Sequence, residues 1–157
     1  MGIHDHGYDD ILHQVHRRFG FTPTIFNSGG NIMILEARLD GGDLIWITDA
    51  DCDVTPLPRR LTIEADGHHV GWQVSIYPPE TQDCGLDIAQ AAPHGQCAPS
   101  AVDVDSCTPL ASVIHQRATT DQLPELIELA LRARRRHEHH IFALDGTHTV
   151  RAGIDRY

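Results

Sequence analysis

The sequence predicts an α+β fold, in which an antiparallel sheet of about five to seven strands packs against an N-terminal helix and a helix in the C-terminal half. Two segments repeat apolar residues every three to four positions, which is the period of an α-helix. Several shorter segments alternate apolar and polar residues between turns rich in glycine and aspartate, which is typical of hairpins. Strand-helix-strand alternation is not seen, so the sequence does not favour a doubly wound parallel sheet.

The two helices are expected at residues 9–18 and 122–137. Asp9 or Asp10 is a suitable N-cap for the first, and Gly20 ends it. In the second, glutamates come early and arginines late, as the helix dipole favours. The apolar stripes are expected to contain Ile11, Leu12, Val15 and Phe19 in the first helix and Leu123, Leu126, Ile127, Ala130 and Leu131 in the second.

The strands are predicted from alternation and from turn chemistry. Residues 31–39 give the clearest pattern, because Met33, Leu35 and Ala37 share one face of an extended chain. The Asp-Gly pairs at 66–67 and 145–146 are hairpin signals. Strands are therefore expected at residues 22–26, 31–39, 44–48, 61–65, 69–77, 141–144 and 147–151.

The whole chain, residues 1–157, is predicted to form one domain with a long irregular segment at about 78–119. This segment is rich in proline, glycine and alanine, carries aspartates and cysteines, and contains no arginine before residue 117. An irregular segment of this length is usually a functional loop or hides a regular element. A short helix near 86–91 or 110–116 is the second possibility.

The chain contains no lysine, since all 12 of its basic residues are arginine. This excludes Schiff-base and pyridoxal-phosphate chemistry, P-loop nucleotide hydrolysis and kinase-type phosphoryl transfer, which all need a lysine. The simplest explanation of the bias is codon usage in a GC-rich genome. No nucleophile motif of the GxSxG type is present either.

The net charge of −10 is unevenly distributed. Residues 1–116 carry 16 acidic residues and 5 arginines, whereas residues 117–157 carry 6 acidic residues and 7 arginines. An acidic surface repels phosphate backbones, so DNA and RNA are disfavoured as partners. The acidic, polar start of the chain and the absence of a long apolar run predict neither a signal peptide nor a membrane span, and hence a cytoplasmic protein.

The long irregular segment carries a possible zinc site. Four cysteine and histidine side chains in one loop suit tetrahedral Zn²⁺. Only His94 and Cys97, with two residues between them, have a spacing that is usual for zinc ligands. Buried free thiols and a Cys84–Cys97 disulfide are the other interpretations. The candidate ligands are Cys84, His94, Cys97 and Cys107.

Histidines are unusually frequent, with 12 in the chain, and they occur in groups. Two histidines on one helix face, joined by a second pair, would form a metal site, but no HExxH motif occurs. Solvent-exposed histidines are the alternative. The groups are His4/His6, His13/His16, His68/His69 and His137/His139/His140.

Two segments are candidate anion-binding sites. Paired glycines in the turn at Ser28, Gly29 and Gly30 present backbone N–H groups to an anion, and arginine grips phosphate with two parallel hydrogen bonds. A serine activated by a nearby histidine is a further reading of the turn. The alternative is that the basic patch of Arg132, Arg134, Arg135 and Arg136 complements the helix dipole and forms helix pairs such as Glu128 with Arg132. The candidate arginines are Arg134, Arg135 and Arg136.

The turn at 27–30, the strands that flank it and the later strand at 71–77 resemble short uncharacterised proteins of actinobacteriophages and related mobile elements. The resemblance covers residues 22–78. It implies a small phage accessory protein, for example one used in counter-defence, that binds a host macromolecule or sequesters a small signalling molecule. It transfers no activity and no site residue.

We therefore expect a small cytoplasmic, non-catalytic binding protein, located in the host cytoplasm if it is phage-encoded. Its partner is expected to be a host protein or a small anionic, nucleotide-like ligand, and the chain is expected to form a homo-oligomer. One alternative is a zinc-binding module or metal-dependent hydrolase that uses the histidines and cysteines. A structural or virion-associated protein is the second alternative.

Overall fold

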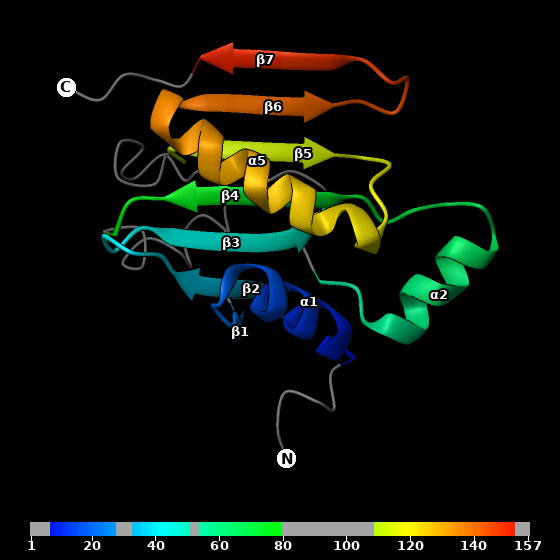
Figure 1. Ribbon diagram of the computed structural model, residues 1–157. Coiled ribbons are helices and arrows are strands. Elements are labelled where there is room, and N and C mark those ends of the chain that lie inside the picture. The colour runs from blue at the N-terminus through cyan, green and yellow to red at the C-terminus, as the bar shows by residue number, and fades with distance from the viewer. Residues whose placement is uncertain (1–6, 28–32, 51–53, 80–108, 153–157) are drawn as a thin grey trace.

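The computed structural model describes residues 7–27, 33–50, 54–79 and 109–152. It confirms the α+β class, with a seven-stranded sheet in the order β1-β2-β3-β4-β5-β6-β7 (Figure 1). The helices of the described residues are α1 (Asp9–Phe19), α2 (Leu57–Ala65) and α5 (Leu123–Arg136), and the 3-10 helix η3 (Thr120–Gln122) precedes α5. The strands are β1 (Thr24–Asn27), β2 (Met33–Arg38), β3 (Leu44–Asp49), β4 (Trp72–Tyr77), β5 (Ala111–His115), β6 (Glu138–Phe142) and β7 (His148–Ala152).

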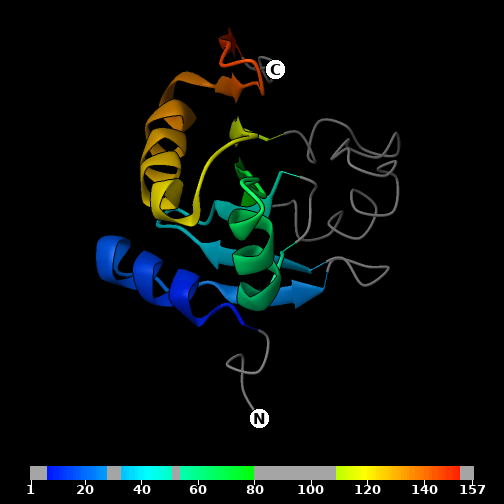
Figure 2. The same ribbon diagram turned by 90° about the vertical axis from the view of Figure 1, so that its right-hand side faces the viewer.

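The sheet is an antiparallel meander followed by one crossover. Each neighbouring pair from β1 to β5 is antiparallel, β5 and β6 are parallel, and β6 and β7 are antiparallel again. The connection between the parallel strands is α5. Helices α1 and α5 cover the same face of the sheet, and α2 lies at the end of the strands (Figure 2).

The main core lies between the sheet and these two helices. The interior strand β3 is buried at all six of its positions, so its two faces are both covered. A smaller apolar cluster lies on the opposite face of the sheet and consists of Ile34, Leu44, Trp46 and Tyr77. The main core includes Ile11, Val15, Leu35, Ile45, Ile47, Trp72, Val74, Ile76, Val113, Leu123 and Ile127.

A buried arginine, Arg60, joins segments that are far apart in the sequence. Its side chain is only 2% exposed, and all five of its N–H groups have an acceptor. It also lies over the ring of Trp72, with 5.9 Å from the guanidinium carbon to the ring centroid. The acceptors are the two carboxylate oxygens of Asp10 (2.7 and 2.8 Å), the carbonyl oxygens of Thr55 (2.8 Å) and Gly7 (3.0 Å), and the hydroxyl of Thr120 (3.2 Å).

The prediction of a strand at residues 61–65 is wrong, because this segment belongs to α2. The alternation of Leu61 and Ile63 with polar residues suggested a strand, but Leu61 is 56% exposed. Arg60 is the buried residue of α2, and Pro58 lies in its first turn. Because the buried residue of α2 is charged, the sequence of this helix lacks the buried apolar stripe from which a helix is usually predicted.

The prediction of a short helix at residues 110–116 is also wrong, since Ala111–His115 forms β5. The strand pairs with β4 on one side and β6 on the other, and its first three residues are buried. The irregular segment therefore contains a strand near its end, and β5, α5 and β6 form a strand-helix-strand unit that the sequence does not predict. The possible helix at 86–91 lies outside the described residues.

The other predicted helices and strands are confirmed, with shifts of a few residues at their ends. The carboxylate of Asp10 binds Arg60 and does not cap α1, whose N-cap residue is Tyr8. Thr119 forms a capping box with Gln122 at the start of η3, which leads directly into α5.

Substitution of Gly71 is expected to destabilise the fold strongly. Gly71 has a φ of +71°, and an added Cβ would lie 2.8 Å from the carbonyl oxygens of His115 and Gln116 and 2.9 Å from the Cβ of Ala50. The overpacking and the left-handed backbone together should cost roughly 2–4 kcal/mol in Gly71→Ala. Chemical denaturation measures this difference.

Gly67→Ala is the matched control, because Gly67 has a φ of +80° but nothing within 4 Å of an added Cβ. It should lose only roughly 1 kcal/mol, from the backbone conformation alone. Equal losses in the two variants would show that the close approach at Gly71 is not a constraint.

The Asp10–Arg60 pair is expected to show strong coupling in a double-mutant cycle. With Asp10→Asn and Arg60→Met, we expect roughly 1–3 kcal/mol of coupling at pH 7 from urea denaturation. The surface pair Arg18–Glu128, with side chains 51% and 46% exposed, serves as the control and should give less than about 1 kcal/mol. A coupling no larger than that of the surface pair would contradict the assigned role of Arg60.

The same pair predicts a pH dependence. Burial raises the pKa of Asp10, but the hydrogen bonds and charge of Arg60 outweigh this, so the pKa lies below its usual 3.8. The stabilisation is then complete above pH 3.8 and is lost as the pH falls through the lowered pKa. The measured coupling should therefore shrink as the pH falls below 3.8 through the lowered pKa, and a coupling that stays constant to the acid limit of folding would contradict it.

Candidate anion-binding site

The end of α5 is joined to β6 by a single residue. His137 has a left-handed backbone with a φ of 53°, and its N–H donates to the carbonyl of Ala133. Glu138 already belongs to β6. This abrupt turn folds the last two turns of the helix over the first half of the strand.

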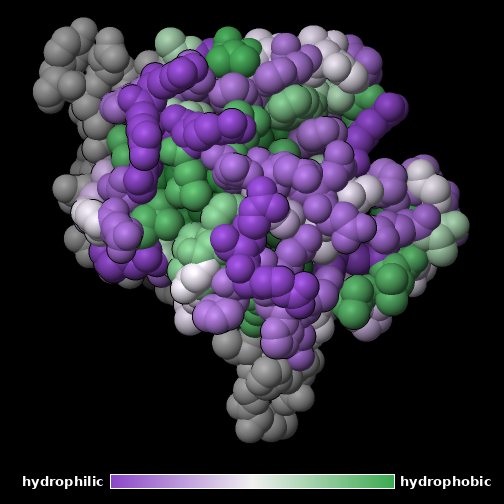
Figure 3. Space-filling model, viewed as in Figure 1, coloured by the Kyte–Doolittle hydropathy of each residue, from purple (hydrophilic) through white to green (hydrophobic). Residues whose placement is uncertain are grey.

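A hollow of about 380 Å³ lies between α5 and β6. Its charged lining combines arginines of the helix with a glutamate and a histidine of the strand, and two apolar residues of α5 complete it. We call it the arginine hollow. It is lined by Leu129, Arg132, Ala133, Arg135, Arg136, Glu138 and His140. Figure 3 shows strongly hydrophilic side chains gathered over this end of α5.

The three arginines of the hollow have no ion pair within the part of the chain that the structure describes. Glu128 lies one turn before Arg132, but its carboxylate pairs with Arg18 of α1 at 2.7 Å. The expected helix pair of Glu128 and Arg132 is therefore not formed. Three guanidinium groups face one carboxylate in the hollow, which leaves an excess of positive charge.

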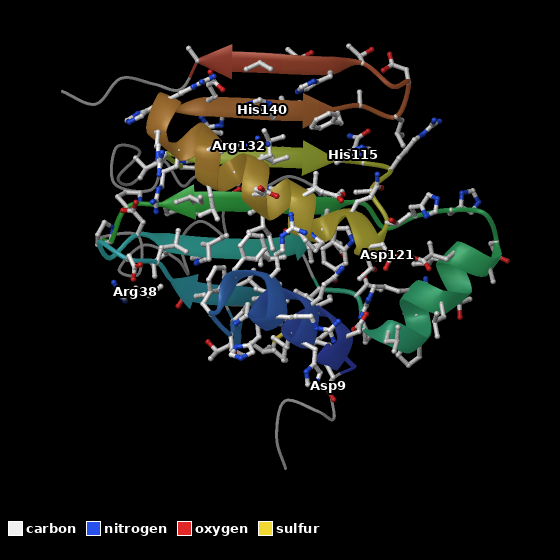
Figure 4. The ribbon with its side chains drawn as sticks, viewed as in Figure 1. Asp9, Arg38, His115, Asp121, Arg132 and His140 are labelled. Atoms are coloured by element: carbon white, nitrogen blue, oxygen red, sulfur yellow. The ribbon has the colours of Figure 1, made fainter. Side chains whose placement is uncertain are left out.

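The carboxylate of the hollow is part of a chain of hydrogen-bonded groups. Glu138 Oε2 lies 3.1 Å from His140 Nε2, and His140 Nδ1 lies 3.1 Å from His148 Nε2. An ionised Glu138 can only accept, so Nε2 of His140 carries the donated proton. If His140 is neutral, its Nδ1 accepts a hydrogen bond that Nε2 of His148 donates. Figure 4 shows His140 on β6 and Arg132 on α5, on the helix-bearing face of the sheet.

A stack of three rings lies farther along β6. Phe142 packs against His148 at 4.0 Å between centroids and against His115 at 4.7 Å, with planes inclined by only 12° and 11°. Burial and the charge of His148 lower the pKa of His115, with burial the larger cause. The stack runs across three neighbouring strands and ends at His148, on the edge strand.

The predicted group His137/His139/His140 is not brought together as one site. His137 caps the helix, and His139 lies on the sheet face opposite to His140, as alternation along a strand requires. There its Nδ1 is 2.6 Å from the hydroxyl of Ser112. Burial, and to a lesser extent the charge of His140, lowers the pKa of His139. Among the described residues, no three His, Cys, Asp or Glu side chains are placed so that together they could hold a metal ion.

A larger hollow of about 760 Å³ lies between α1 and α5. Its charges are mixed, since its lining combines three acidic residues with two arginines and one histidine. The carboxylate of Asp10 is already paired with Arg60. It has no excess of positive charge for an anion. Its lining includes Asp10, His13, Arg17, Arg18, Asp121 and Glu125.

The structure separates the predicted arginines. Arg135 and Arg136 line the hollow, whereas Arg134 lies 3.3 Å from Asp43 in the turn between β2 and β3. The positions of the arginines along the helix indicate this separation. Arg132 and Arg136 are four residues apart and share a helix face, whereas Arg134 lies half a turn away. The other predicted site residues, namely Ser28, Gly29, Gly30, Cys84, His94, Cys97 and Cys107, lie outside the described residues.

No helix of the described residues has both the length and the apolar character needed to cross a membrane.

Comparison of the chain with protein-family models, with curated proteins and with solved structures found no match.

Proposed function

We propose that the chain is a non-catalytic binding protein that holds a small phosphate-bearing ligand in the arginine hollow. One observation carries the proposal: three arginines without an ion-pair partner in the described residues line a single hollow beside only one carboxylate. Guanidinium groups bind phosphate oxygens through paired, charge-assisted hydrogen bonds. If the arginines served only to complement the helix dipole, they would not need to line the same hollow.

The size and lining of the hollow agree with this role. A volume of about 380 Å³ lies in the range of small-ligand sites, which is roughly 300–1,000 Å³. Leu129 and Ala133 supply an apolar wall for an uncharged part of the ligand. The net charge of −10 opposes extended nucleic acids, whose many phosphates would meet an acidic surface, but it tolerates one local anion.

The resemblance to actinobacteriophage proteins supports a biological setting for the proposal. A phage accessory protein that sequesters a small signalling molecule needs binding without catalysis, in the cytoplasm of the host. The proposal also retains a homo-oligomer, as expected from the sequence. Binding of a host protein in place of the small ligand is the competing version.

Removal of the hollow's arginines is expected to weaken binding of inorganic pyrophosphate. Arg132→Gln and Arg136→Gln should each raise the Kd about tenfold, since a hydrogen bond to a charged group contributes about 1.5–3 kcal/mol. Isothermal titration calorimetry measures this. Arg59→Gln, on exposed α2, is the control and should leave the Kd unchanged. Equal affinities in all variants, or no binding at all, would overturn the proposal.

Neutralisation of Glu138 is expected to have the opposite effect. Glu138→Gln keeps an oxygen that accepts from His140 but removes the one carboxylate of the hollow, so pyrophosphate should bind several-fold more tightly. The gain should shrink in high salt. Glu64→Gln, a charge change on α2, is the control. A weaker or unchanged affinity in Glu138→Gln would show that the anion does not occupy the hollow.

A further inference from the structure

We infer that the ligand of the arginine hollow is a nucleotide whose base stacks on His148. The inference rests on the proposed function, because the same hollow would hold the phosphate. It adds a second contact, made by the ring stack of His115, Phe142 and His148.

Among the described residues, no ring stacks on the outer side of His148. His115 belongs to β5, Phe142 to β6 and His148 to β7, and the register places the three residues directly beside one another. β7 is the edge strand of the sheet, and all five of its residues are exposed. One ring face of His148 is covered by Phe142, and the next position in the stack lies beyond the edge of the sheet. A planar ring added there would continue the stack.

The stack and the hollow lie at opposite ends of one strip of the sheet. On β6, Phe142, His140 and Glu138 follow each other at every second position and so share a face, opposite His148, Val150 and Ala152 of β7. Phe142 and His140, the lining residue nearest to the stack, are one step of two residues apart, which is about 7 Å. A nucleotide has its base and its phosphates separated by distances of this order. The sugar would then lie over Val150, which is 49% exposed.

Hydrogen bonds connect the two ends of this strip. His148 bonds to His140, which lines the hollow and bonds to Glu138. Because His148 Nε2 is engaged with His140, its ring is held in the plane set by Phe142. A fixed ring costs little additional side-chain entropy when a base stacks on it. The site thus combines a preorganised stacking surface with converging guanidinium groups, as recognition of a nucleotide requires.

The competing occupant of this surface is a sugar phosphate without a base, or inorganic phosphate. The hollow alone would bind these equally well. Only the stack distinguishes them from a nucleotide, so the comparison of AMP with ribose 5-phosphate isolates the contribution of the base. The two compounds carry the same phosphate and the same sugar.

The experiment measures the Kd of AMP and of ribose 5-phosphate by ligand-observed NMR for the whole chain and for four variants, namely His148→Ala, His148→Phe, His13→Ala and Arg132→Gln. AMP should bind about tenfold more tightly to the natural sequence, because stacking of a base on an aromatic ring is of that size. His148→Ala should remove this preference and leave the affinity for ribose 5-phosphate nearly unchanged. His148→Phe should restore the preference, since it keeps the ring and loses only the bond to His140.

His13→Ala is the matched control, because His13 is an exposed histidine of α1 that lines the other hollow. It should keep the full preference for AMP. Upfield shifts of the adenine protons on binding, present in His148→Phe and absent in His148→Ala, give a direct readout of stacking. A variant that fails to fold is recognised by its one-dimensional spectrum, and His148→Phe then decides alone.

Each outcome separates the two proposals. If AMP and ribose 5-phosphate bind with equal affinity and both depend on Arg132, the nucleotide inference is wrong and the phosphate site stands. If neither binding depends on Arg132, the proposed function itself is wrong. A preference for AMP that persists in His148→Ala would place the base elsewhere and would also overturn the inference.

Discussion

The burial of Arg60 is the constraint on which the arrangement of the helices depends. A guanidinium group withdrawn from water must keep all of its donors occupied, and here the acceptors come from the N-terminal segment, α1, the loop before α2 and η3. Because η3 leads directly into α5, the group that holds Thr120 also determines where α5 begins. An internal polar network therefore positions the helix whose far end carries the candidate site.

The position of α5 has consequences at its C-terminal end. The contact between α1 and α5 includes the Arg18–Glu128 ion pair, and this pair occupies the carboxylate that would otherwise neutralise Arg132. Arg134 is directed to Asp43 of the neighbouring turn. The remaining arginines converge on the hollow because His137 adopts a left-handed conformation that turns the chain at once into β6. Among the described residues, these three arrangements leave the arginines of the hollow in excess over its one carboxylate, that of Glu138.

Much of this fold was predictable from periodicity, and its exceptions have physical causes. α1 and α5 have apolar stripes, and β1 to β4 lie in segments with alternating or turn-bounded apolar residues, so these elements are predicted correctly, whereas β5 is not. α2 was not predicted, because its buried residue is Arg60, and its apolar side chains are only partly buried or exposed. β6 was placed three residues too late, since Glu138, His139 and His140 do not alternate apolar and polar side chains. Positions that serve a polar site are expected to violate the patterns of a core. The spacing of the arginines in the sequence shows which of them share a helix face. The pairing of Glu128 with Arg18 of α1 can be seen only in the tertiary structure.

The central claim is that an anion occupies the hollow between α5 and β6. A titration of isotope-labelled protein with inorganic pyrophosphate, followed by two-dimensional ¹H–¹⁵N NMR, tests it most directly because it locates the contact without any substitution. We expect the largest, saturable shift changes at residues 129–140, with smaller changes on β7. Changes centred on the hollow between α1 and α5, or no saturable change anywhere, would contradict it.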